Sequence, residues 1–529
     1  MRLTLQGLIS DRESWKKANI ALPKNDLAAM REKTAKSPKW VHFGAGNIFR
    51  GFIAALQQKL LDEGLDDTGI IAAETFDYEI IKKIYDPFDC LTLMVTLRAS
   101  GKMDMNVIAS IAQGIRADSS DSAEWAKLKA VFVNPSLQMV SYTITEKGYA
   151  LRDMKGELMP VVVSDMKAGP DAPKHAMSVT ASLLLERFRA GAKPIAVVSM
   201  DNCSHNGEKL RGSVLEVAKA WLDNGFVDKE FYSWISDESQ VSFPWSMIDK
   251  ITPRPADIVE AEVKKLGVED MSPVITNRNT YIAPFVNAEA PQYLVIEDNF
   301  PNGRPALEKA GVYMTDRDTV NKTERMKVTT CLNPLHTALA VYGCMLGYTK
   351  IADEMNDPEL KKLVELIGYK EGLPVVTDPK ILDPKKFIDE VVGERLPNAF
   401  LPDTPQRIAT DTSQKITVRF GETLKSYAAD KKLDIKSLIA IPLALAGWLR
   451  YLDGTDDNCE AMSVSSDPML ETLQSELKKP DGLKEILSNK NIFGVNLYEA
   501  GLGEKVEGLY HELKAGKGAV RAVLKKYLG

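Results

Sequence analysis

The sequence predicts an α/β protein with a mostly parallel sheet in its N-terminal part and a mostly helical C-terminal part. Short β-branched segments alternate with helical stretches up to about residue 200. A glycine-rich turn, Gly44-Ala45-Gly46, separates the first of the main segments from a helical one. After about residue 300 the helical pattern dominates, which indicates a second domain of a different class.

Five apolar segments predict strands, because they are short, β-branched and separated by helical stretches or turns. The Pro-rich region around Thr252-Pro-Arg-Pro-Ala-Asp and Pro284–Pro301 contains further extended segments, and we expect it to join the two parts. Residues 434–452 predict a buried helix that is kinked or restarted at Pro442. The five expected strands are 41–43, 70–73, 91–97, 139–145 and 195–200.

Composition excludes several functional classes. The chain has 529 residues, enough for two or more domains, and a net charge of −6 that gives no basic surface for nucleic acid. No run of 18 apolar residues and no signal-peptide core is present. Five cysteines lack CxxC spacing, and Cys203 with His205 is too small a set for zinc. We therefore expect a cytoplasmic, metal-free monomer or small homo-oligomer that binds a small molecule, with no nucleic-acid or membrane partner.

The turn at residues 44–46 has the first two glycines of a dinucleotide fingerprint. The first permits the tight turn, and the second lets the backbone approach a pyrophosphate at the helix N-terminus. The acidic residues after the next strand are positioned to bind an adenosine ribose, which favours NAD over NADP. Phe49 replaces the third glycine, so an ordinary strand–turn–helix is the alternative. The expected cofactor-binding residues are Gly44, Ala45, Gly46, Asn47, Ile48, Phe49, Glu74 and Asp77.

Residues 327–336 place Lys327, Asn333 and His336 at the start of a long apolar run. A lysine whose pKa is lowered by burial can act as a general base near neutral pH. Asn and His can donate hydrogen bonds to a developing alkoxide. The alternative is an ordinary helix with one surface Lys, a capping Asn and a core His.

Further polar residues follow predicted strands or breaks. Glu146 leaves one strand and Asn202 and Asn206 leave another, at the sheet edge where α/β proteins bind ligands. Asp249 follows a shorter extended segment, and Arg407 and Lys415 lie in the helical part. Each of these segments, taken alone, is also compatible with turn chemistry or a surface ion pair.

Six motifs in this order resemble the polyol-specific long-chain dehydrogenase/reductase family, which includes mannitol 2-dehydrogenases and fructuronate and tagaturonate reductases. They are His42-Phe-Gly-Ala-Gly, Thr145-Glu-Lys-Gly-Tyr, Asp201-Asn-x-x-x-Asn-Gly, Ser246-Met-Ile-Asp-Lys-Ile-Thr-Pro, Asn302-Gly-Arg-Pro-Ala-x-Glu-Lys-x-Gly-Val and Lys327…Leu-Asn-x-x-His. The resemblance implies a Rossmann-type dinucleotide-binding domain over residues 1–298 and a helical substrate-binding domain over 299–529.

The resemblance also implies an NAD-dependent oxidoreductase for D-mannonate and D-fructuronate, or for altronate and tagaturonate. A mannitol or arabinitol 2-dehydrogenase and a non-catalytic dinucleotide-binding sensor are the alternatives. The implied catalytic group is Lys327 as base, Asn202 and Asn333 as the pair that holds the reacting oxygen, and His336 as the residue that orients the substrate, with no metal. The implied substrate-binding residues are Glu146, Asn206, Asp249, Glu324, Arg407 and Lys415.

The spacing departs from the family pattern, because five residues instead of four separate Lys327 from Asn333. On a regular α-helix this extra residue would rotate Lys327 to the face opposite His336. For the lysine to share a site with Asn333, the segment must contain an i→i+5 hydrogen bond or a break before Pro334.

Overall fold

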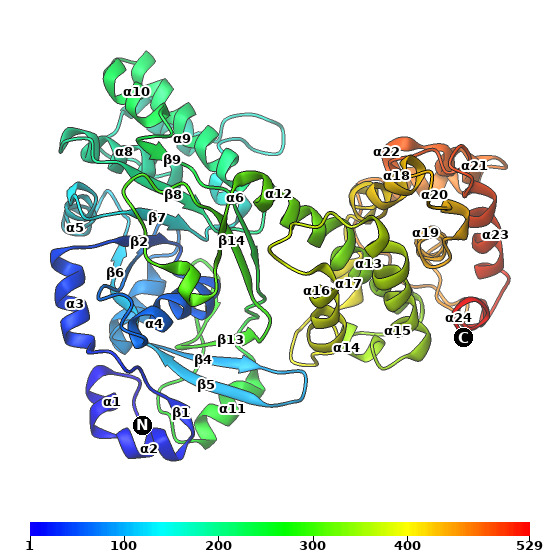
Figure 1. The fold of residues 1–529 in the computed structure, drawn as a ribbon, viewed down its shortest axis with the longest axis horizontal. Helices are drawn as coiled ribbons and strands as arrows, with labels where there is room; N and C mark the ends of the chain where they lie inside the picture. Colours follow the sequence, from blue (N-terminus) through cyan, green and yellow to red (C-terminus); the bar gives the residue numbers. More distant parts are fainter. The chain divides into compact units, whose positions relative to one another are not determined.

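The computed structural model describes all residues, 1–529, and divides them into two compact units (Figure 1). Unit 1 comprises Met1–Leu97 and Met103–Asn321, and unit 2 comprises Arg98–Lys102 and Lys322–Gly529. Unit 1 is built around parallel strands and unit 2 is helical, which confirms the predicted fold class. The division lies beyond residue 298, because one later strand, β15 (Tyr313–Thr315), still pairs with β14 (Tyr293–Glu297) within unit 1.

Six parallel strands form the central sheet of unit 1, in the order β6-β3-β2-β7-β8-β9. This is the order of a doubly wound Rossmann sheet, with the topological switch point between β2 and β7. Four of the five predicted strands lie in it. The strands are β2 (Trp40–Phe43), β3 (Ile70–Glu74), β6 (Ile111–Arg116), β7 (Met139–Tyr142), β8 (Ile195–Ser199) and β9 (Val241–Ser242).

Two expectations about strands were wrong. The segment 91–97 forms β4 (Thr92–Leu97), which lies in a separate mixed sheet, antiparallel to β5 and parallel to β13. The Pro-rich region does not join the units, because its strands pair inside unit 1. Apolar alternation identifies a strand but not its sheet. The remaining strands are β1 (Ile20–Ala21), β5 (Met103–Ile108), β10 (Ser246–Asp249), β11 (Val274–Ile275), β12 (Tyr281–Ile282), β13 (Phe285–Glu289), β14 (Tyr293–Glu297) and β15 (Tyr313–Thr315).

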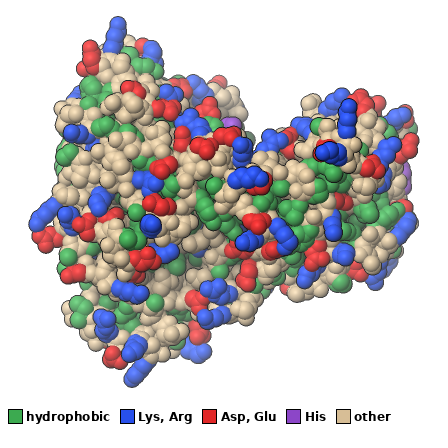
Figure 2. Space-filling model, in the orientation of Figure 1, with side chains coloured by type: hydrophobic (Ala, Val, Ile, Leu, Met, Phe, Trp, Pro, Cys, Tyr) green, Lys and Arg blue, Asp and Glu red, His purple; other side chains and the backbone are tan.

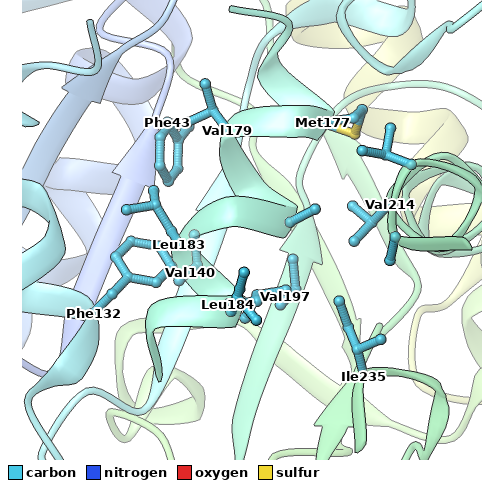
Figure 3. Packing of buried hydrophobic residues seen from close by; sticks show 14 of the residues in the cluster. Phe43, Phe132, Val140, Met177, Val179, Leu183, Leu184, Val197, Val214 and Ile235 are labelled. Carbon is cyan, nitrogen blue, oxygen red and sulfur yellow. The ribbon is translucent and has the colours of Figure 1, made fainter. Parts of the chain in front are cut away.

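Helices cover both faces of the central sheet, so its strands are buried on both sides. On one face Phe43 and Val140 pack against Phe132 and Leu183 (Figure 3). On the other face Trp40 belongs to a second apolar layer. The helices of unit 1 are α1 (Leu5–Ser10), α2 (Arg12–Lys17), α3 (Leu27–Lys36), α4 (Ala54–Asp62), α5 (Ser122–Val133), α6 (Thr145–Tyr149), α7 (Pro160–Ala168), α8 (Ala176–Arg189), α9 (Asn206–Asp223), α10 (Lys229–Ser236) and α11 (Asp257–Lys265).

Unit 2 packs around the buried helices α13 (Asn333–Met345) and α19 (Ala440–Tyr451). The predicted restart at Pro442 is confirmed, since α19 begins two residues earlier. The Glu371 carboxylate accepts the amides of Ile439, Ala440 and Ile441 at 2.6–2.8 Å and so caps the helix. The other helices are α12 (Arg317–Met326), α14 (Ile351–Glu354), α15 (Pro358–Glu365), α16 (Pro384–Glu390), α17 (Pro405–Ile408), α18 (Glu422–Ala429), α20 (Leu470–Glu476), α21 (Gly482–Ser488), α22 (Lys490–Phe493), α23 (Gly503–Leu513) and α24 (Ala519–Leu528).

On the face shown in Figure 2, Lys and Arg side chains are interspersed with Asp and Glu side chains. None of the helices combines the length and the apolar character needed to cross a bilayer. The five cysteines are all free thiols.

Glu354 is a carboxyl group buried in unit 2 without a partner. Its side chain is fully buried, and neither carboxyl oxygen accepts or donates a hydrogen bond. It packs so closely on Gly343 that a Cβ there would lie 1.9 Å from Oε1. Burial raises the pKa of Glu354 to about 9, and Asp357 and Asp353 add to the shift.

We predict that Glu354→Gln stabilises the protein progressively as the pH rises. A group whose folded pKa is raised contributes stability that is fully present below its unfolded pKa and is lost as the pH rises through about 9. Denaturant unfolding between pH 5 and pH 10 should show the wild type losing on the order of a few kcal/mol relative to the variant. Glu485→Gln, at an exposed position of α21, is the control. Parallel pH curves for wild type and Glu354→Gln would contradict the assignment.

Candidate functional site

The glycine turn after β2 has two glycines with different physical roles. Gly44 has φ +103°, and a Cβ there would lie 2.2 Å from the carbonyl oxygen of Thr143, so only glycine fits. A Cβ at Gly46 would meet nothing within 4 Å. The space above Gly46 is therefore open, as a glycine beside a bound pyrophosphate requires. A helix begins just beyond, at Asn47, and its first N–H groups have no partner within the helix.

Glu74, the last residue of β3, holds the glycine turn in place. Its carboxylate accepts the amide of Ala45 at 2.8 Å and the amides of Phe76 and Asp77 at 2.8 and 3.2 Å. Burial raises the pKa of Glu74, and these amide donors oppose the shift. Asp77 is buried and accepts the hydroxyl of Thr276 at 2.5 Å, while its Oδ1 has no partner. Of the four carboxyl oxygens of Glu74 and Asp77, the Oδ1 of Asp77 therefore makes no hydrogen bond within the protein.

The missing third glycine is explained by an irregular turn. Phe49 is fully buried and stacks on the His42 ring, with centroids 4.1 Å apart. The helix is widened there into a π-helical turn, η1 (Phe49–Ile53). Gly51 lies in that turn, and a Cβ on it would be 2.6 Å from Val286 of β13. Gly51 thus provides the close packing expected of the third glycine, two residues later than the motif predicts.

The polar residues after β8 mostly hold the loops together. The Asp201 carboxylate accepts the amides of Ile144 and Thr145 and the hydroxyl of Tyr149 at 2.6–3.1 Å. It thereby joins the ends of β7 and β8. Asn206 is buried, and its amide bonds to Ser199, Asp201 and Ser246. Since its donors and acceptor are used inside the protein, Asn206 is placed to position the loop, unlike the expected substrate contact.

The other predicted residues of unit 1 lie on the same loops or on β10. Asn202 is exposed on the loop that Asp201 anchors. Glu146 is exposed in α6 and pairs with Lys209. Asp249 is buried at the end of β10. Sequence reasoning missed the tie from Tyr149 to Asp201, although both residues belong to the motifs that it identified.

The segment that carries Lys327 is not a regular α-helix. Residues Lys327–Cys331 form a π-helical turn, η5, in which the Leu332 amide donates to the Lys327 carbonyl at 3.1 Å. The predicted i→i+5 hydrogen bond is confirmed. A π-helical turn contains one residue more than an α-turn, so it absorbs the extra residue between Lys327 and Asn333. Lys327 itself is buried, with 2 % of its surface exposed.

Asn333 and His336 lie in the first turn of α13, directly after the wide turn. The side-chain amide of Asn333 is half-buried and makes no hydrogen bond within the protein, which leaves it available to a ligand. The Nε2 atom of His336 is 3.6 Å from Asp403, too far for a hydrogen bond. The pKa of His336 is lowered to about 4, mainly by burial. Asp403 opposes this shift, and nearby arginines contribute to it. Its imidazole is therefore neutral at pH 7.

Cations surround His336 within unit 2. Arg407 pairs with Asp403, and Lys415 donates to the carbonyl of Thr410. Burial lowers the pKa of Lys415, and the charge of Arg419 adds to this. Arg419, which the sequence did not single out, donates to the hydroxyl of Thr337, the fifth residue of α13. The sequence did contain one indication of its role, because Arg419 follows Lys415 by four residues, the spacing of neighbours on one face of a helix. Glu324 lies half-buried in α12.

No three His, Cys, Asp or Glu side chains of the structure are grouped as metal ligands. The polar groups at the ends of β2, β7 and β8 in unit 1, and separately those at the start of α13 in unit 2, are amides, carboxylates and cations. Such a set can bind a dinucleotide at the glycine turn and a hydroxyl-rich anion near α13.

Comparison with known proteins gives consistent matches. A family model for the mannitol dehydrogenase Rossmann domain matches residues 38–309, and one for the mannitol dehydrogenase C-terminal domain matches 319–514. A D-mannonate oxidoreductase of Thermotoga maritima is 53 % identical, with 100 % of this chain and 99 % of that protein covered. A polyol:NADP oxidoreductase of Gluconobacter oxydans is 31 % identical, with 89 % and 90 % covered. The structure of Pseudomonas fluorescens mannitol 2-dehydrogenase with NAD and D-mannitol has a TM-score of 0.70 at 26 % identity, with 99 % of each chain covered.

The wide turn makes a testable prediction about chain length. Deleting Val328, the one partly exposed residue of η5, should convert the π-helical turn to an α-turn and keep Lys327 in register with Asn333. Inserting one alanine after Val328 should rotate Lys327 by about 100° and abolish turnover. The deletion and insertion variants are compared by their turnover at saturating substrate and cofactor. Circular dichroism shows whether each variant is folded. A folded deletion variant as inactive as the insertion variant would show that register is not the reason for the wide turn.

Proposed function

Because the chain belongs to the mannitol dehydrogenase family of oxidoreductases, we propose that it interconverts the secondary alcohol D-mannonate and the ketone D-fructuronate. The observation that carries this proposal is the identity of 53 % with a D-mannonate oxidoreductase over the whole of both chains. The pair altronate and tagaturonate, or a neutral polyol and its ketose, are the other substrates to test. A non-catalytic sensor is disfavoured by the buried lysine of η5 and by the amide donor at the start of α13, because a sensor needs neither.

Unit 1 has the features needed to bind the dinucleotide. The open space over Gly46 and the helix that begins at Asn47 suit its pyrophosphate. The acidic groups of Glu74 and Asp77 suit a free ribose hydroxyl and oppose a 2′-phosphate, so we propose NAD as the preferred cofactor. When bound, this cofactor would supply the hydride transfer to and from the substrate carbon. Ala45, Ile48 and Phe49 shape the turn that holds the phosphates.

Lys327 is the proposed proton-transfer residue. In the oxidative direction its neutral amine takes the proton of the substrate hydroxyl, and in the reductive direction its ammonium returns that proton to the carbonyl oxygen. The amides of Asn333 and Asn202 are the proposed donors to the same oxygen, which carries negative charge in the transition state. His336, neutral at pH 7, orients the substrate by hydrogen bonding. Glu146 and Glu324 are proposed to exchange protons with solvent.

Arg407 and Lys415 are the proposed contacts to the far end of the substrate, with Asp249 as a hydroxyl acceptor. The two cations suit an anionic substrate end, although hydroxyl groups can also accept hydrogen bonds from them. The structure therefore favours a sugar acid without excluding a polyol at these positions.

The substrate proposal can be tested by following absorbance at 340 nm with purified protein. D-fructuronate should be reduced with a kcat/KM at least about 100-fold above that of D-fructose, and NADH should be preferred over NADPH. Tagaturonate is the stereochemical control. Preference for fructose would replace the sugar-acid assignment by a polyol dehydrogenase, and no reduction of any ketose with bound NADH would support the sensor.

Lys327→Ala should lower turnover by about 10²–10⁴-fold, because a general base is lost, while NADH affinity stays unchanged. In the oxidative direction, the wild-type rate should rise with pH as the base loses its proton, and this rise should be absent in the variant. Fluorescence titration with NADH is the control for cofactor binding. Near-wild-type turnover in Lys327→Ala would transfer the role to another group, with Glu324 and Glu146 tested next.

A further inference from the structure

Arg419 is a half-buried guanidinium without a carboxylate partner. It lies in the π-helical turn η10 (Thr417–Gly421), and its hydrogen bond within the protein goes to the neutral hydroxyl of Thr337. Burial lowers its pKa to about 10, and no acidic group counters that effect. Taking a cation out of water without a counter-charge is costly, so such a group marks a place where an anion is expected.

The charged residues near Arg419 also leave positive charge without an ion-pair partner. Arg407 is paired with Asp403, but Lys415 bonds only to a backbone carbonyl. Burial and the charge of Arg419 lower the pKa of Lys415 by more than Asp411 and Asp467 raise it. His336 contributes no positive charge at pH 7, because its pKa is about 4. Lys415 and Arg419 therefore lie close enough to interact, and neither forms an ion pair with a carboxylate.

We infer that Arg419, together with Lys415, binds the carboxylate of the substrate and sets the preference for a sugar acid over a neutral polyol, an inference that rests on the proposed function. Arg419 is anchored on Thr337, four residues or about 6 Å along α13 from Asn333. In D-mannonate the carboxylate carbon is four bonds from the carbon that is oxidised, about 5 Å in an extended chain. An oxygen held by Asn333 would thus place the carboxylate within reach of the guanidinium.

The chemistry of the two cations suits a carboxylate better than a hydroxyl. The planar guanidinium can donate two parallel hydrogen bonds to the two carboxylate oxygens, and the ammonium of Lys415 adds a point charge. A hydroxyl group can accept one such bond but does not neutralise the charge. The alternative is that Arg419 only fastens η10 to α13 through Thr337.

Steady-state kinetics of the full-length enzyme with NADH can separate the two roles. Arg419→Met should lower kcat/KM for D-fructuronate by about 10–100-fold, mainly through KM, and change that for D-fructose less than about threefold. Arg419→Lys keeps the positive charge but loses the two parallel N–H donors of the guanidinium. Its kcat/KM for D-fructuronate should therefore lie between those of the wild type and Arg419→Met. The wild-type KM for D-fructuronate should rise with ionic strength, and that for D-fructose should not. Lys425→Met, a surface cation of α18 paired with Glu422, is the matched control.

Parallel losses for both substrates, or no loss for either, would overturn the inference and leave Arg419 a structural link. If the wild type reduces no sugar acid, the proposed function fails, and calorimetry with D-mannonate and D-mannitol in the presence of NADH still tests the site. Binding of D-mannonate that Arg419→Met loses and Lys425→Met keeps would support the anion site. Equal affinity of wild type and Arg419→Met for D-mannonate would refute it.

Discussion

The hydrogen bond from the Leu332 amide to the Lys327 carbonyl is the constraint on which the proposed chemistry depends. Without it, the extra residue in this segment would turn Lys327 away from Asn333 and His336. A wide turn loses regular α-helical bonds, and its neighbours compensate. The Thr329 hydroxyl donates to the Arg325 carbonyl at 2.8 Å, and the Thr329 carbonyl accepts the hydroxyl of Thr423 at 3.3 Å. The irregularity is therefore supported by its surroundings.

The same device recurs where the proposal needs side chains to be placed off the regular helical repeat. Of the six π-helical turns, η1 follows the glycine turn and brings Gly51 against β13, η5 begins at Lys327, and η10 carries Arg419. Such turns are rare in α-helices and occur frequently at functional sites. Their positions here link the proposed dinucleotide, proton-transfer and carboxylate contacts to one backbone feature.

Sequence reasoning succeeded where periodicity or simple geometry decides. The central strands, the helical second half and the irregularity after Lys327 follow from alternation, helical period and rotation per residue. It failed where the partner decides. β4 looked like a strand of the central sheet, and β6 was missed because its edge position leaves polar residues between apolar ones. Asn206 was expected to contact a ligand, but groups of its own loop and of β10 engage its amide.

Arg419 illustrates the limit most clearly. The sequence contains 67 Lys and Arg residues, and nothing in it distinguishes a cation that has a carboxylate partner from one that lacks it. That distinction arises when η10 packs on α13 and separates Arg419 from any acid, while Arg407 receives Asp403. A substrate carboxylate would take the place of the missing internal acid. Because folding has already removed the Arg419 guanidinium from much of its water, substrate binding would not have to repeat that cost. Discrimination between a sugar acid and a polyol would then depend on charge compensation, whereas the proposed roles of Lys327 and Asn333 concern the hydroxyl that both substrates share.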